Sequence, residues 1–145
     1  MLDEMKALVK ENFFCVLATV SGGEPHCSLM SYAVDEECRE IYMITLQQTK
    51  KYRNLLENDA VSLLIDTRGK DSDAQREKIR ALTVNGVFRR IEDEGKKEAA
   101  RARLFERHPD LKEFADHPEA EVFVVKVQSF QLLNGITDSY FETVA

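Results

Sequence analysis

Two segments of this sequence are apolar on both faces of the strand that each predicts. Residues 13–20 read FFCVLATV, and residues 121–133 begin EVFVVKV, so alternate positions do not separate into a core face and a solvent face. Strands of this kind must be covered on both sides. In a small antiparallel sheet the cover comes from closure into a barrel, from a second copy of the chain, or from both.

Turn residues separate the first strands. Ser21-Gly22-Gly23-Glu24 predicts a tight turn after residue 20, and Asp35-Glu36-Glu37 predicts another after residue 34. We therefore expect strands over 13–20, 26–34 and 41–45 to form a three-stranded antiparallel meander. An amphipathic helix over residues 2–11 precedes it.

Strands and helices continue along the rest of the chain. Asn85-Gly86 lies inside a long apolar segment and indicates a bulge there rather than a hairpin turn. A polar loop or short helix is expected over 67–78, and the tail 134–145 is free to fold over a neighbouring subunit. The pattern predicts one α+β domain, residues 1–145, with a barrel of about six strands. The remaining strands are expected over 60–66, 80–91 and 121–133, and the helices over 49–58, 96–107 and 110–115.

The start of the helix predicted over 49–58 carries an unusual charge. Thr49 is a good N-cap, but Lys50 and Lys51 fall in the first turn. The positive end of a helix disfavours cations there by ~0.3–1 kcal/mol each. A phosphate would accept hydrogen bonds from the free backbone N–H groups, the Thr49 hydroxyl and both ammonium groups. The alternative is a helix start with two solvated lysines, at small cost.

The composition excludes several classes of function. The 145-residue chain has a formal net charge of −6, and a nucleic-acid coat or an anionic membrane surface requires a basic footprint instead. No apolar run approaches the ~20 residues of a membrane span, and the N-terminal segment is charged and amphipathic, unlike a signal peptide. Cys15, Cys27 and Cys38 lack metal-ligand spacing and are expected to be free thiols in a reducing cytoplasm.

An ordered series of motifs carries a family resemblance. A strand is followed by Gly23-Glu24-Pro25, a second strand, a third strand ending in Thr45, and then, after three residues, Thr49-Lys50-Lys51 at a helix start. In this order the segment 15–66 resembles the FMN-binding split β-barrel superfamily, the pyridoxamine-5′-phosphate-oxidase-like proteins. The implied fold is α+β, an antiparallel six-stranded split β-barrel with flanking helices.

The resemblance implies a bound FMN and a homodimer, because the flavin of this superfamily lies between two subunits. Arg68, Tyr140 and Phe141 are candidates for the second subunit's contribution. The residues at matching positions form two sets. The phosphate would be held by Thr45, Thr49, Lys50 and Lys51, and the flavin ring would be lined by His26, Ser28, Leu29, Met30 and Ser31.

The chain also departs from the pyridoxamine phosphate oxidases. It lacks the C-terminal arginine and histidine signature with which those enzymes hold substrate, so that activity is not expected. His108 and His117 each precede a proline and are interpreted as helix-end residues. We expect a cytoplasmic FMN-dependent oxidoreductase of unknown substrate, with no metal and no assigned catalytic acid or base. The alternatives are a flavin or haem carrier or sensor on the same barrel, and an OB-type nucleic-acid-binding barrel, which the acidic balance opposes.

Overall fold

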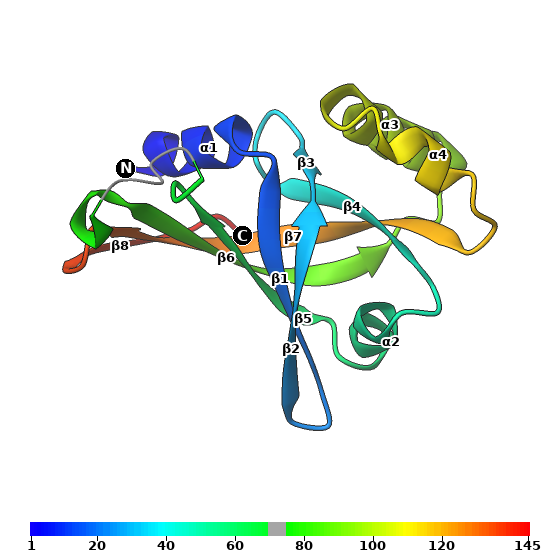
Figure 1. Ribbon diagram of the computed structural model, residues 1–145, viewed down its shortest axis with the longest axis horizontal. Coiled ribbons are helices and arrows are strands. Elements are labelled where there is room, and N and C mark those ends of the chain that lie inside the picture. The colour runs from blue at the N-terminus through cyan, green and yellow to red at the C-terminus, as the bar shows by residue number, and fades with distance from the viewer. Residues whose placement is uncertain (70–74) are drawn as a thin grey trace.

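A computed structural model of the chain describes residues 1–69 and 75–145. The described strands form one curled antiparallel sheet in the order β2-β1-β5-β6-β7-β4-β3, with β8 paired to β7 (Figure 1). The strands are β1 (Phe14–Ser21), β2 (Glu24–Ser31), β3 (Ala33–Val34), β4 (Glu40–Leu46), β5 (Ala60–Asp66), β6 (Arg80–Arg90), β7 (Ala120–Asn134) and β8 (Asp138–Thr143). The helices are α1 (Leu2–Glu11), α2 (Lys50–Glu57), α3 (Glu94–Arg107) and α4 (Leu111–Ala115), with a 3₁₀ helix, η1, at Arg76–Lys78.

A single residue, Tyr32, joins the two ends of the sheet. The strand before it, β2, pairs with β1, whereas β3 after it pairs with β4 at the other end of the strand order. The Tyr32 amide donates to the Phe13 carbonyl (3.2 Å), and its hydroxyl donates to the Val9 carbonyl (2.6 Å). Its own carbonyl accepts a hydrogen bond from His108 Nε2 (2.9 Å). The chain therefore closes the barrel through one fully paired, buried residue.

The predicted α+β split barrel is confirmed, but the meander prediction is wrong. The first two strands form the predicted hairpin, and Asp35-Glu36-Glu37 lies in the predicted turn between β3 and β4. The segment predicted as one strand over 26–34 breaks at Tyr32, and β4 pairs with β7 and β3 rather than with β2. Turn signals predict that neighbouring strands pair, and barrel closure overrides this preference because pairing β4 with β7 encloses the inner face of β7.

The described residues contain eight strands rather than the predicted six. Part of the difference is β8, which forms a hairpin with β7 of the same chain, whereas the sequence indicates that the tail 134–145 is free to fold over a neighbouring subunit. Asn134-Gly135 is a hairpin signal, and Gly135 has φ +73, a left-handed conformation that favours glycine. Of the loop or short helix predicted over 67–78, η1 is described, whereas residues 70–74 lie outside the described residues.

The predicted bulge in the long strand is confirmed. The register between β6 and β7 shifts between Asn85 and Gly86. A Cβ atom at Gly86 would lie 2.6 Å from the Lys126 carbonyl oxygen and 2.6 Å from Val125 Cγ1. Only glycine allows the two strands to approach this closely.

The two strands that are apolar on both faces have different surroundings. In β7, Phe123 and Val125 face the barrel interior, and Val122 and Val124 pack in a second cluster with Ala100 and Leu104 of α3. In β1, the inner face is buried, but Phe14 on the outer face is 57% exposed. The chain therefore covers both faces of β7 and leaves the outer face of β1 without full cover.

Candidate functional site

The start of α2 presents free backbone donors, as its sequence predicted. The N-cap Thr49 accepts a hydrogen bond from the Tyr52 amide (3.3 Å) and donates its hydroxyl to the Leu46 carbonyl (2.8 Å). The first intrahelical bond runs from the Arg53 amide to the Thr49 carbonyl (3.2 Å). The amides of Lys50 and Lys51 precede that bond and have no intrahelical acceptor. Two backbone donors thus remain at the positive end of the helix.

Lys51 brings a poorly paired cation to the same place. Its Nζ lies 3.3 Å from Met30 Sδ on β2, and a thioether sulfur is a weak acceptor. Burial lowers the pKa of Lys51, and no carboxylate of residues 1–69 or 75–145 forms an ion pair with it. The buried Thr45 at the end of β4 places its hydroxyl 3.4 Å from that of Thr49. Together these donors form a set suited to an anion.

A groove of about 180 Å³ passes these groups. It combines an ammonium group and two hydroxyls with a majority of apolar side chains, so it suits a ligand with an apolar body and an anionic group. Leu29 is 74% exposed and Phe114 is 38% exposed, an unusual amount for such side chains within one small groove. The groove is lined by Leu29, Met30 and Ser31 from β2, Ile44 and Thr45 from β4, Lys51 from α2, and Leu111 and Phe114 from α4.

Five of the nine predicted binding residues line this groove. They are Leu29, Met30, Ser31, Thr45 and Lys51. Thr49 adjoins it through its contact with Thr45, whereas Lys50 is exposed and lies outside the lining. His26 and Ser28 are half-buried further along β2, opposite Thr19 and Leu17 of β1. The structure thus gathers most of the two predicted sets in one place, and their binding role stays a prediction.

Sequence reasoning missed the contribution of Ile44, Leu111 and Phe114 to the groove. The sequence did predict a helix over 110–115, which contains Leu111 and Phe114. The groove residues opposite them were not predictable, because these lie about 65 to 85 positions away in the sequence, on β2 and β4.

The candidates for the second subunit's contribution lie elsewhere on the sheet. Arg68 forms an exposed ion pair with Asp66 (Nε to Oδ2, 3.1 Å) beside a second groove of about 320 Å³. That groove is lined by Phe14, Val16, Leu29 and Leu64 among others, so Leu29 borders both grooves. Tyr140 and Phe141 lie on β8, opposite Leu132 and Gln131 of β7.

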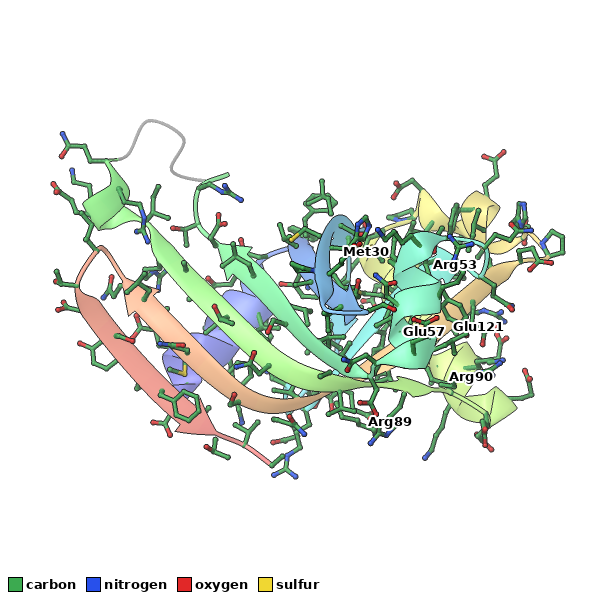
Figure 2. The ribbon with its side chains drawn as sticks, turned by 90° about the horizontal axis from the view of Figure 1, so that it is seen from below. Met30, Arg53, Glu57, Arg89, Arg90 and Glu121 are labelled. Carbon is green, nitrogen blue, oxygen red and sulfur yellow. The ribbon has the colours of Figure 1, made fainter. Side chains whose placement is uncertain are left out.

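A charged cluster lies on the other side of α2. Figure 2 shows Met30 to one side of this helix, and Arg53, Glu121 and Arg90 towards the other. Glu121 is paired with Lys97 (3.4 Å) and accepts a hydrogen bond from Gln47 (3.4 Å). Burial raises the pKa of Tyr52, whose hydroxyl has no hydrogen-bond partner among the described residues. The carboxylate of this cluster is engaged by the protein, which distinguishes it from the Lys51 side.

Two further features, a cluster of metal-ligating side chains and a membrane-spanning helix, are absent from the described residues. These residues contain no group of three or more His, Cys, Asp or Glu side chains placed to hold a metal ion. None of the described helices is long and apolar enough to cross a membrane.

Comparison with known proteins bears on fold and family. The model of a protein family described as "Pyridoxamine 5'-phosphate oxidase" matches residues 1–134. A search of curated protein sequences finds no match.

Solved structures resemble the fold over nearly the whole chain. They include a haem binding protein from Mycobacterium smegmatis, with 23% identity, a TM-score of 0.85 and coverage of 97% of this chain and 56% of that one. The haem storage protein HutZ from Vibrio cholerae has 20% identity, a TM-score of 0.76 and coverage of 91% and 92%. An FAD-binding protein from Mesorhizobium loti has 17% identity, a TM-score of 0.72 and coverage of 91% and 93%. At these identities the likeness is one of fold, and this chain spans little more than half of the mycobacterial protein.

Proposed function

Because the chain belongs to the pyridoxamine 5′-phosphate oxidase family, as its motifs predicted, we propose that it binds FMN and acts as an oxidoreductase on a small molecule. The observation that supports this most is the environment of Lys51. Its half-buried ammonium group has a thioether as its close neighbour, beside two hydroxyls and the free amides of α2. An anionic ligand would supply the acceptor that the Lys51 ammonium group and the first amides of α2 lack, whereas the Thr49 hydroxyl already donates to the Leu46 carbonyl.

Different residues in and around the groove would bind the phosphate and the ring of the cofactor. Lys51, Thr45, Thr49 and the first amides of α2 would bind the phosphate, with the exposed Lys50 adding charge from outside. Leu29, Met30 and Ser31 would lie along the ring, and His26 and Ser28 would extend that contact along β2. FMN would supply the redox chemistry, and the chain would orient it and exclude water.

We also propose a homodimer formed through the outer face of β1, β2 and β5. Leu29, Val16 and Leu64 form one cross-strand row on that face, next to the exposed Phe14. Leu29 and Phe14 are exposed and Val16 and Leu64 are half-buried, and apolar surface of this kind typically marks protein interfaces. The groove in one chain measures about 180 Å³, below the roughly 300–1,000 Å³ of ligand pockets, so a second copy would complete it.

The dimer is tested by placing a charge in the middle of that row. Leu64→Glu should give a monomer by sedimentation and should lose most FMN binding, since a desolvated carboxylate in an apolar interface is costly. The matched control is Leu56→Glu on the exposed side of α2, which should stay dimeric. A Leu64→Glu protein that remains a dimer would contradict this interface.

Flavin binding is tested by the visible spectrum of the purified protein and by titration with FMN. We expect a yellow protein, and we expect the double variant Lys50→Ala/Lys51→Ala to lose its colour while staying folded and dimeric. Lys6→Ala/Lys10→Ala on α1 removes the same charge and should keep the flavin. Full flavin occupancy in the Lys50/Lys51 variant would refute the phosphate site.

Haem carriage is the second candidate, because two proteins with this fold are described as haem binding and haem storage proteins. The groove would then hold an apolar macrocycle, with Lys51 near a carboxylate substituent. Titration with haemin and with FMN separates the two functions. A Soret band that saturates at one haem per chain, with no FMN binding, would favour the carrier.

A further inference from the structure

We propose that Phe114 of α4 is the apolar wall of the groove and packs against the ring of the bound cofactor. This inference rests on the proposed function and adds a residue that the phosphate-binding motifs do not include. Phe114 lines the groove together with Lys51 and Thr45, although it lies more than 60 residues away from them in the sequence.

The packing of α4 directs Phe114 towards the groove. Leu111 and Ala115 pack against the apolar cluster that lies beneath α3, and so they attach α4 to the sheet. Phe114 lies about 100° around the helix from Ala115, at the margin of that buried face. At this margin 38% of its surface stays exposed. The exposed part of the ring is therefore available to a ligand in the groove.

The backbone of α4 holds this wall in position. The Leu111 amide donates to the His108 carbonyl (3.0 Å), and the His117 amide donates to the Phe114 carbonyl (3.1 Å). A five-residue helix does not persist alone in water, so its position depends on these bonds and on its packed face. Phe114 is thus presented before any ligand arrives, which lowers the entropy cost of binding.

The apolar surfaces of the groove match a flat ring. Phe114 and Leu29 are both substantially exposed, one on α4 and one on β2, and Ile44 lies buried with them in the lining. A ring placed there would remove apolar surface from water and could stack on the Phe114 ring. Lys51 and the hydroxyls then recognise the anion, while Phe114 recognises the ring.

This division of roles is tested with three probes: FMN, riboflavin and inorganic phosphate. Phe114→Ala should raise the Kd of FMN and of riboflavin by the same factor, about tenfold. Inorganic phosphate should displace FMN from Phe114→Ala with an unchanged inhibition constant. Lys51→Ala should weaken FMN and leave riboflavin nearly unchanged. Phe114→Trp should restore FMN affinity, and circular dichroism verifies that each variant folds.

The matched control is Leu56→Ala, which truncates an exposed apolar side chain of α2 outside the groove lining. It should bind FMN like the wild-type protein. If Phe114→Ala keeps the FMN affinity of Leu56→Ala within twofold, the inference is wrong and the flavin assignment stands. If the wild-type protein binds haemin instead, the same comparison is made with haemin and decides the inference in the same way. If the wild-type protein binds neither, both proposals fail together.

Discussion

The Tyr32 junction and the start of α2 both gather several polar groups in one place, but they differ in how those groups are paired. At Tyr32 the amide, the hydroxyl and the carbonyl each have a protein partner, and the side chain is fully buried. At α2, Lys51 faces a thioether and two amides lack intrahelical acceptors. Completed pairing stabilises a fold, whereas missing acceptors leave room for a ligand.

The end of α3 supplies much of the pairing at the junction. His108 donates to the Tyr32 carbonyl, and Arg107 donates to the Lys10 carbonyl (2.9 Å). The Arg107 guanidinium also lies over the Phe13 ring, 4.4 Å from its centroid. The interpretation of His108 as a helix-end residue is correct, since it is the C-cap of α3. Its side chain also stabilises the junction between β2 and β3 by donating to the Tyr32 carbonyl.

The largest effect should come from removing the paired side chain at the junction. Tyr32→Ala deletes a buried ring and its hydrogen bond, and it should lower the free energy of unfolding by about 3–5 kcal/mol. Tyr32→Phe keeps the ring and leaves the Val9 carbonyl unpaired, so it should cost about 1–2 kcal/mol. Urea denaturation measures both. Equal losses of unfolding free energy in the two variants would mean that the hydroxyl, and not the ring, accounts for the stability of the junction.

The two lysines of α2 should differ in how much each contributes to FMN binding, which tests whether the poorly paired groups at the start of α2 hold a ligand. Lys51→Ala should raise the Kd of FMN about 10- to 150-fold, because it removes a charged donor in a half-buried groove. Lys50→Ala should raise it only about two- to fivefold, since that ammonium group is exposed. Neither change should shift the unfolding free energy of the free protein by more than about 1 kcal/mol. Titration of each variant with FMN measures the ratio, and equal Kd values for both would contradict the assigned geometry.

The smallest effect concerns pH. Burial lowers the pKa of Lys51 below its ordinary 10.5 in the folded protein, so the unfolded chain binds more protons in the interval between the two pKa values. Stability should therefore rise as the pH increases through that interval, and the rise should be small because the group is only half-buried. Denaturation at a series of pH values gives the slope of the unfolding free energy against pH for the wild-type protein and for Lys51→Met. A steeper rise in the Lys51→Met profile would show that the sign is wrong.

Local features of the chain were predictable because they depend on neighbouring residues. Thr49 caps α2 as expected, β5 spans the predicted residues, and the Asn85-Gly86 bulge lies where a strand glycine indicated it. The motif order also identified the family. Lys51 of the groove and its neighbour Thr49 followed from the same local logic, since Thr49, Lys50 and Lys51 are consecutive at the start of α2.

Sequence alone determined which faces need cover, and only tertiary structure decided what covers them. Periodicity shows that β7 is apolar on both sides, but its pairing with β4, as in Tyr42 opposite Val124, joins residues more than 80 positions apart. The placement of Phe114 beside Lys51 is of the same kind. Such partners depend on the burial gained across the whole barrel, and no local pattern encodes that sum.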